Sequence, residues 1–338
     1  MLSRYDYQRK LLTRGAVLTS LGLLFLLLSA CSSSNTPKVY HVGILSGLDF
    51  FANTVDGFKA GMEALGYVEG QNIVYDLQKT NEEPDKEVAI LKKFVDEKVD
   101  LIFVFPTEEA QEAKTATQGT NIPVLFAQAN IEGIGLVDNV RAPGGNITGV
   151  RFPGPDLAVR RFDILRELLP KAKRMWVPYL KGYLNVAPQL DAVRPEAAAA
   201  GVTLEEAPVT TLDDIRAALQ PHDQANDIDA ILNIAEPIAV EPDAFAVYAK
   251  FAAEHKIPVG GSPMSVEGYA AVFGVATDNV AVGKQAAPIA DKILKGTPAG
   301  TIPVASAESF LQINYKAAQA VGLTVPQGLL GMANQIIR

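Results

Sequence analysis

From residue 39 onward the chain alternates short, wholly apolar runs with amphipathic stretches, and this alternation constrains the fold more than any other feature. The run at 101–105 (LIFVF) is β-branched and aromatic, as a buried strand is. The stretch at 53–65 repeats its apolar residues every three or four positions, as one face of a helix does. Strands that are apolar on both faces and separated by helices form parallel sheets covered on both sides. The sequence therefore predicts an α/β fold.

The same two patterns recur to the C-terminus, interrupted by a Gly/Pro-rich segment at 142–146. The interruption predicts two consecutive α/β units of similar size. Strands are expected at 39–45, 73–77, 101–105, 123–127, 174–177, 203–209, 229–234, 258–261, 270–275 and 310–314. Helices are expected at 53–65, 85–98, 108–117, 157–169, 186–200, 212–219, 243–255, 280–295, 315–321 and 328–337.

The N-terminus has the layout of a secretory signal. Four basic residues within the first 14 positions precede an uncharged, Leu-rich run at 15–30, which is shorter than the ~20 apolar residues of a spanning helix. The small residues before Cys31 resemble a bacterial lipobox, a signal in which the cysteine thiol is acylated. We therefore predict a signal peptide at 1–30, lipid on Cys31 and a polar tether at 31–37; the alternative is an uncleaved membrane anchor.

Cysteine count and charge exclude several classes of protein. Cys31 is the only cysteine, so a disulfide within the chain and a thiolate metal site are both excluded. The leader carries four basic residues and one acid, so the rest of the chain has a net charge of −11, against −8 for the whole. That acidic balance argues against nucleic-acid binding and against electrostatic adhesion to anionic lipid. The histidines are too scattered for a metal site, and no catalytic motif, dinucleotide fingerprint or Walker motif is present.

Several segments, in order, resemble the ABC-transporter substrate-binding proteins whose best-known members bind tryptophan and other aromatic amino acids. The likeness spans the chain from about residue 39, and it is the order and spacing of the pieces that make it specific. The segments are 56–59, 65–73, 98–102, 106–110, 122–127, 143–150, 168–174, 283–287, 313–314 and 325–326.

The resemblance implies a type I periplasmic-binding-protein fold: two doubly wound parallel-sheet lobes with a hinge and an interlobe cleft. The chain would cross between the lobes three times. Lobe 1 would then comprise 38–147 and 265–297, and lobe 2 would comprise 148–264 and 298–338. The lobes would close on the ligand by a hinge motion.

The resemblance also implies a role without catalysis. A monomeric, lipid-anchored chain outside the cytoplasm would capture a small molecule, of which an amino acid is the family expectation. It would deliver that ligand to an ABC permease whose ATPase is a separate subunit, and no cofactor or metal is expected. A ligand sensor of the same fold that docks on a membrane receptor, or an exported enzyme, remains an alternative.

Several candidate ligand residues follow from strand ends, because ligands of such sheets bind beyond the carboxyl ends of the strands. The others follow from the resemblance, which places Thr148 at the crossing between the lobes, Tyr183 and Asn185 on the lobe 2 face of the cleft, and a family acid at Asp278. Thr107 opens a helix whose free N–H groups can hold a carboxylate. Glu236 stands where the family usually has Asp, and Asn130 stands near where the family has Asp-Pro, so a carboxylate is missing there. The complete set is Ser46, Asp49, Thr107, Asn130, Thr148, Tyr183, Asn185, Glu236 and Asp278. A helix cap at Thr107 or Asp278, and a solvated turn around Ser46 and Asp49, are the competing interpretations.

Overall fold

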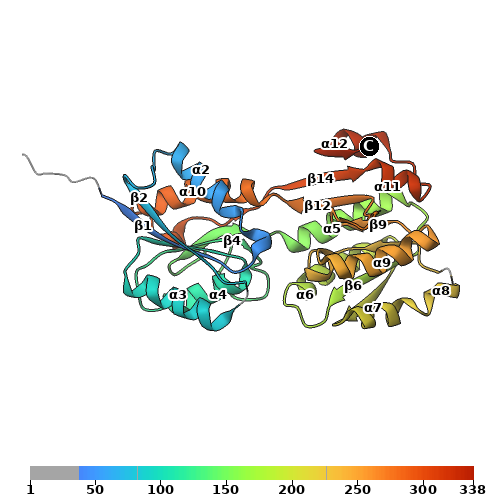
Figure 1. The fold of residues 1–338 in the computed structure, drawn as a ribbon, viewed down its shortest axis with the longest axis horizontal. Helices are drawn as coiled ribbons and strands as arrows, with labels where there is room; N and C mark the ends of the chain where they lie inside the picture. Colours follow the sequence, from blue (N-terminus) through green and yellow to red (C-terminus); the bar gives the residue numbers. More distant parts are fainter. Residues whose placement is uncertain (1–37, 82, 226) are drawn as a thin grey trace, which may run out of the picture. The chain divides into compact units, whose positions relative to one another are not determined.

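A computed structural model describes residues 38–81, 83–225 and 227–338. The predicted signal peptide, Cys31 and the tether lie outside these residues. Residues 41–338 form one compact unit that contains two large sheets, one of six strands and one of seven. Both carry helices on both faces, so the predicted α/β fold with two doubly wound, mainly parallel sheets is confirmed (Figure 1).

The first sheet has the order β13-β5-β4-β3-β1-β2, and we call it, with its helices, lobe 1. The pairings β1–β3, β3–β4, β4–β5 and β5–β13 are all parallel. Its strands are β1 (Tyr40–Ser46), β2 (Ile73–Lys79), β3 (Leu101–Phe105), β4 (Val124–Ala129), β5 (Ile147–Arg151) and β13 (Ala305–Ser306). Its helices are α2 (Thr54–Ala64), α3 (Pro84–Asp96), α4 (Thr107–Ala116) and α10 (Asn279–Leu294).

Alternate residues of the lobe 1 strands fill two separate cores. In β3, Ile102 and Val104 join the core under α3 and α4, whereas the ring of Phe103 stacks on Phe58 of α2 on the opposite face. This is the period of two that strand geometry imposes. Figure 1 shows α2 and α10 on one side of the sheet and α3 and α4 on the other.

Helices α2 and α10 lie in close contact although 214 residues separate the end of one from the start of the other. A Cβ on Gly57 would stand 1.9 Å from the Val280 carbonyl oxygen, and one on Gly283 would stand 2.1 Å from the Thr54 carbonyl oxygen. Only glycine permits this approach of two helix backbones. The pairing explains why a C-terminal helix returns to lobe 1.

The second sheet has the order β15-β14-β12-β9-β8-β6-β7, and we call it, with its helices, lobe 2. Its strands are β6 (Arg174–Leu180), β7 (Thr203–Val209), β8 (Ala230–Leu232), β9 (Val259–Gly261), β12 (Phe273–Thr277), β14 (Ser309–Asn314) and β15 (Gln335–Ile337). Its helices are α5 (Gly154–Leu168), α6 (Val186–Ala199), α7 (Leu212–Leu219), α8 (His222–Ala225), α9 (Pro242–His255), α11 (Tyr315–Ala320) and α12 (Gln327–Met332). A small antiparallel pair, β10 (Ser265–Val266) with β11 (Tyr269–Ala270), stands apart from both sheets.

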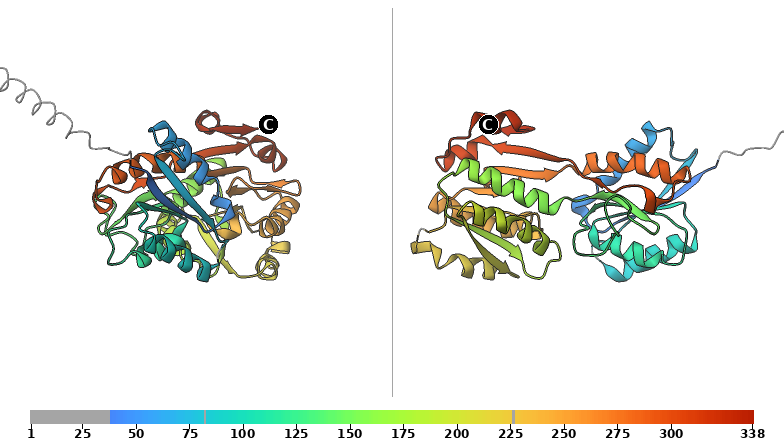
Figure 2. Two further views of the ribbon diagram at one scale, coloured as in Figure 1. Left: turned by 60° about the vertical axis from the view of Figure 1, so that its left-hand side comes forward. Right: turned by 180° about the vertical axis from the view of Figure 1, so that it is seen from behind.

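The lobe 2 strands divide their side chains in the same way. Met175 and Val177 enter the core under α5 and α6, whereas Trp176 between them packs with Phe245 and Tyr248 of α9. The helices on each face can be followed from behind in Figure 2.

The strand pairings shift the boundaries expected for the two lobes. β5 pairs with β4 in lobe 1, although residues from 148 onward were expected in lobe 2. β12 pairs with β9 and β14 in lobe 2, although 265–297 was expected in lobe 1. β13 pairs with β5, although 298–338 was expected in lobe 2. The chain therefore passes between the sheets near 152, 278 and 307, because strands belong where their backbone hydrogen bonds are made.

The C-terminal helix expected at 328–337 is wrong in its second half. Helix α12 ends at Met332, and β15 then pairs in parallel with β14. Asn334 makes this possible, because its N–H donates to the Leu311 carbonyl at 2.8 Å while its Oδ1 accepts from the Leu311 N–H at 2.8 Å. The tertiary contact with an existing strand edge thus overrides the local helical pattern.

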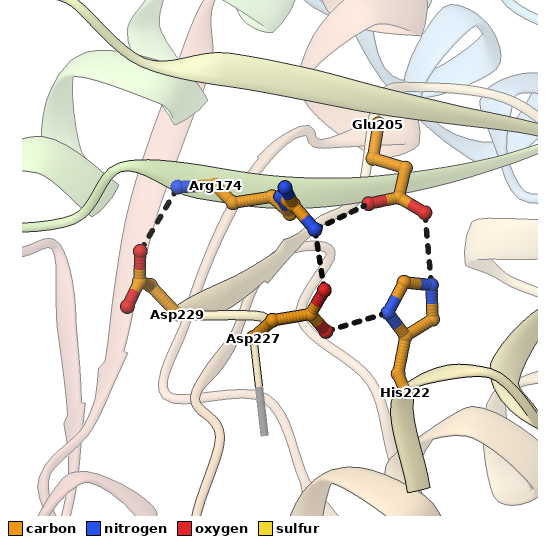
Figure 3. A network of polar contacts seen from close by, with 5 residues as sticks. All are labelled: Arg174, Glu205, His222, Asp227 and Asp229. Carbon is orange, nitrogen blue, oxygen red and sulfur yellow. Dashed lines mark hydrogen bonds and ion pairs between the residues drawn. The ribbon is translucent and has the colours of Figure 1, made fainter. Parts of the chain in front are cut away.

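A polar network secures the amino ends of the lobe 2 strands (Figure 3). His222 of α8 contacts Glu205 of β7 and Asp227, each at 2.8 Å. Arg174, the first residue of β6, reaches the same two carboxylates, and Asp229 accepts from the Arg174 N–H at 2.9 Å. The network lies at the edge opposite the carboxyl ends of the strands, so it anchors α8 and takes no part in a site at that end.

Candidate functional site

The carboxyl edge of the lobe 1 sheet has its switch point between β1 and β3. The chain leaves β1 through α2 for β2 on one side, and it leaves β3 through α4 for β4 on the other. Such a divergence creates the crevice in which ligands of open α/β sheets bind. Ser46 and Thr107, two of the predicted residues, both lie at this point and are buried. The Gly47 N–H donates to the Phe105 carbonyl at 3.0 Å and holds the two strand ends together.

Thr107 is the first residue of α4, and its Oγ1 accepts a hydrogen bond from the Asn130 N–H at 3.1 Å. The structure thereby brings Thr107 and Asn130 together at adjacent strand ends. Asn130 is buried, and its Oδ1 stands 2.8 Å from where a Cβ on Gly154 would lie. A side chain at Gly154 would collide with Asn130, so this glycine permits the close passage from lobe 1 into α5.

Three of the predicted residues have other partners. Thr148 lies inside β5, where its Oγ1 donates to the Ile302 carbonyl at 2.7 Å, so it is not at the strand end with the others. Asp278 caps α10, and its Oδ1 accepts from the Ala281 N–H at 2.6 Å. Asp49 is exposed and accepts from the Asn81 side-chain amide at 3.5 Å.

In lobe 2, Glu236 is buried between the ends of β6 and β8. Its Oε2 accepts from the Leu180 N–H at 2.8 Å, and its Oε1 accepts from the Ala239 N–H at 2.8 Å. Burial raises the pKa of this carboxyl to about 7, while the backbone hydrogen bonds and Arg161 act in the opposite direction.

Arg161, in the middle of α5, is the buried cation beside Glu236. Its guanidinium donates to the Val275 carbonyl at 2.6 and 3.0 Å and to the Asn233 carbonyl at 3.1 Å, which ties the middle of β12 to the residue that follows β8. Burial lowers its pKa to about 10, and Glu236 partly offsets this shift. The guanidinium therefore stays charged at neutral pH and balances the nearby carboxylate.

The α6 end of lobe 2 adds further buried polar groups. Asn185, at the N-cap of α6, is buried, and its Oδ1 has no hydrogen-bond partner among the described residues. Gln189 donates to the carbonyls of Asn185 and Ala235 at 2.8 and 2.7 Å, and so links α6 to the segment before Glu236. Tyr183 packs half-buried against the lobe 2 core.

Sequence reasoning missed several buried polar residues at the same edges. Asn233 and Ser262 follow β8 and β9 directly, are fully buried, and have side-chain atoms without a hydrogen-bond partner in the described part of the chain. The strand-end rule used for Glu236 would have found both. Arg161 gave no such signal, because a basic residue within a helix is usually on a solvated face.

Glu109 is the missed residue in lobe 1. It lies in the first turn of α4, is 1% exposed, and its carboxyl folds back against its own backbone N–H. Its Oε1 lies 1.5 Å from where a Cβ on Gly47 would stand, so the carboxyl occupies the space above that glycine. Burial, together with the charges of Glu87, Glu108 and Glu112, raises its pKa to about 8.

Metal-binding groups and membrane-spanning helices bear on the kind of site. Across residues 38–81, 83–225 and 227–338, no three His, Cys, Asp or Glu side chains are placed to hold a metal ion together. In the same residues no helix combines the length and apolarity needed to cross a membrane.

Comparison with known proteins decides the family. Residues 42–337 match the family described as ABC transporter substrate binding protein. The chain belongs to this family. The predicted family membership is therefore confirmed over nearly all of the described chain.

Individual relatives of this substrate-binding protein support the family assignment. The tyrosine-binding protein of Clostridioides difficile (strain R20291) is 28% identical over 270 residues, which are 79% of this chain and 76% of the relative. A substrate binding protein with adhesive properties from Clostridium difficile, solved ligand-free and open, has a TM-score of 0.74 at 26% identity, over 88% of this chain and 99% of that one. A Streptococcus pneumonia ABC domain in complex with L-Trp shares the fold, with a TM-score of 0.73 at 24% identity over 89% and 100% of the two chains.

Proposed function

We propose that this substrate-binding protein captures an amino acid, with an aromatic amino acid first among the candidates, in a cleft between the two lobes. The observation that carries the proposal is the gathering of buried polar side chains at the carboxyl ends of the strands in both lobes. Ser46, Thr107 and Asn130 supply lobe 1, and Asn185 and Glu236 supply lobe 2. The tyrosine-binding relative supports the ligand class.

Capture would involve closure of one lobe on the other about the segments near 152, 278 and 307, where the chain passes between the sheets. Arg151, at the end of β5, pairs with Glu132 after β4 and with Asp156 in α5, so it joins the two sides of the first of these segments. A few loop residues that absorb backbone rotation are the usual form of such hinges.

We further propose that the chain is exported, cleaved and acylated at Cys31, and that it delivers its ligand to an ABC permease whose ATPase is a separate subunit. The N-terminal layout supports export and acylation, and family membership supports the transporter. A Cys31→Ser variant would then fail to incorporate a fatty-acid label and would keep its uncleaved leader. Incorporation of the label into this variant, or no incorporation into the wild-type chain, would contradict acylation at Cys31.

Ligand binding is tested by thermal unfolding of the full chain in detergent, dialysed free of bound ligand, against the twenty common amino acids. A ligand at 100 times its Kd stabilises the folded state by about 2.7 kcal/mol. We expect the largest shift with an aromatic amino acid, and we expect Asn185→Ala to reduce it. Absence of a shift with every amino acid would reject this ligand class.

A further inference from the structure

The N-terminus of α4, where a ligand carboxylate was expected beside Thr107, is already occupied by a carboxyl group of the chain itself. Glu109, in the first turn, folds back against its own N–H at this helix end. A helix N-terminus favours a negative group, so an internal carboxyl there competes directly with a ligand carboxylate. The lobe 1 side of the switch point therefore holds an acid of the chain itself.

The position of Glu109 is built into the neighbouring strand end. A Cβ on Gly47 would stand 1.5 Å from Oε1 and 2.0 Å from Cδ of Glu109, so any other residue at position 47 would displace the carboxyl. Gly47 directly follows β1 and is tied to the end of β3. The carboxyl thus lies at the divergence of the two strands, where the family fold places its ligand.

One oxygen of this carboxyl has no hydrogen-bond donor among the described residues. Oε2 of Glu109 is buried and makes no hydrogen bond with the described residues. Glu87, by contrast, accepts from the Thr80 hydroxyl at 2.6 Å. A buried carboxyl oxygen without a donor costs free energy unless a ligand or a proton supplies one.

The charged neighbours of Glu109 determine which charge a ligand group must carry to bind beside Oε2. Glu108 and Glu112 on α4 and Glu87 on α3 are all acids, and Glu112 also carries a buried oxygen without a partner in the described chain. A carboxylate or phosphate would be repelled here, whereas a cation would be attracted and would receive hydrogen-bond acceptors. The absence of any metal-competent group of three side chains in the described residues favours an organic cation over a metal ion.

We propose that Glu109 is the lobe 1 specificity residue and that it accepts a hydrogen bond from the ammonium group of the ligand. The ligand is then an amine, or an amino acid oriented with its ammonium group toward lobe 1. Because Glu109 is 1% exposed, its side chain has to rotate past Gly47 for Oε2 to reach that group. This inference rests on the proposed capture of a small molecule between the lobes.

Proton release on binding is a direct consequence. A carboxyl with a pKa of about 8 is mostly protonated at pH 7. An ammonium group beside it favours the charged form and lowers that pKa, so the proton leaves when the ligand binds. A side chain that merely capped α4 would show no such release.

The test is calorimetric titration of the full, ligand-free chain at pH 7, in two buffers of different ionisation enthalpy. The probes are L-tyrosine, tyramine, which lacks the carboxylate, and 3-(4-hydroxyphenyl)propionate, which lacks the ammonium group. Wild type is compared with Glu109→Gln and with Glu63→Gln, an exposed glutamate of α2 as the matched control. We expect tyrosine and tyramine to bind wild type and Glu63→Gln with release of about one proton. Glu109→Gln should lose this release and at least roughly tenfold in affinity, which is one charge-assisted hydrogen bond.

Several outcomes would overturn the inference and leave the proposed function intact. These are tightest binding of the propionate, or equal affinity and proton release in Glu109→Gln and wild type. A rise in Tm with calcium chloride alone would assign the acids to a metal ion instead. Binding of none of the three probes would reject tyrosine-like ligands and this inference with them, whereas the thermal screen of all twenty amino acids tests the proposed function separately.

Glu236 and Glu112, with pKa values of about 7, could also release a proton at pH 7, so the wild-type count is repeated at pH 8, where these two are largely ionised and Glu109 is still about half protonated. Release that persists at pH 8 assigns the proton to Glu109 even if Glu109→Gln folds poorly, and release that disappears at pH 8 overturns the inference.

Discussion

The two lobes each bury a glutamate at the carboxyl edge of their sheet, but the two carboxyls have opposite surroundings. In lobe 2, both oxygens of Glu236 accept backbone N–H groups, and Arg161 is the nearby cation. In lobe 1, Oε2 of Glu109 has no hydrogen-bond partner among the described residues, and the charges that act on it are all acids.

Burial alone therefore does not define a ligand group. The Glu236 carboxyl is satisfied within the chain and fixes the ends of β6 and β8, so it can hold the lobe 2 site in shape without a ligand. The Glu109 carboxyl lacks a hydrogen-bond partner for Oε2 among the described residues, and a bound proton or a ligand would satisfy this oxygen.

The largest effect is expected from Arg161→Met, which removes the cation that balances Glu236 and leaves the Val275 and Asn233 carbonyls without their donor. Loss of one partner of a buried charged pair costs roughly 3–5 kcal/mol of stability. Urea unfolding measures the change, and Arg166→Met, an exposed position on the same helix, is the control. Equal stability of the two variants would show that Arg161 does not balance Glu236.

Because of Glu109, the free energy of unfolding should fall as the pH rises. Its pKa is about 8 in the folded chain against an ordinary value of 4.5, so between these pH values the folded chain retains a proton that the unfolded chain has lost. Stability from this group is therefore full below about pH 4.5 and declines as the pH rises to about 8. Glu109→Gln removes this decline, on the order of a few kcal/mol.

Urea midpoints at pH 5 and pH 8.5 measure the effect. The wild-type chain should lose more stability between the two pH values than Glu109→Gln does, with Glu63→Gln behaving as wild type. Parallel losses in all three proteins would mean that Glu109 titrates normally, and the contrast with Glu236 would then disappear.

Glu236→Gln should destabilise the chain where Glu109→Gln does not. At pH 8 the Glu236 carboxyl, with a pKa of about 7, is largely ionised and accepts two backbone N–H groups. A glutamine turns its amino group toward one of these donors, which costs about 1–3 kcal/mol. Urea unfolding at pH 8 measures this, with the exposed Glu241→Gln as control. Unchanged stability would show that the hydrogen bonds of the Glu236 carboxyl do not stabilise the folded chain, and the contrast with Glu109 would be lost.

The smallest effect concerns Asp278, whose carboxylate caps α10. Asp278→Ala should cost about 1 kcal/mol, and Asp278→Asn only a few tenths, since asparagine also caps helices. Thermal unfolding compares the two variants. Loss of ligand affinity in the stable Asp278→Asn variant would add Asp278 to the binding site, whereas unchanged affinity would restrict it to the cap.

The sequence alone determined the alternation of strands and helices and most element positions. The expected strand at 203–209 and the expected helix at 212–219 coincide with β7 and α7, because buried strands and amphipathic helices leave periods of two and 3.6 in the apolar residues. Strand ends followed directly, and they located Ser46, Thr107, Asn130 and Glu236 at the carboxyl edges of their sheets.

Tertiary structure alone decided which sheet each late segment joins and which polar groups remain unsatisfied. β12, β13 and β15 are short, and their place depends on hydrogen bonds to strands far away in the chain. Glu109 appears in the sequence as an ordinary acidic residue of a helix first turn. Only the fold buries it above Gly47 among other acids, because burial and charge depend on distances between segments that local sequence patterns do not encode.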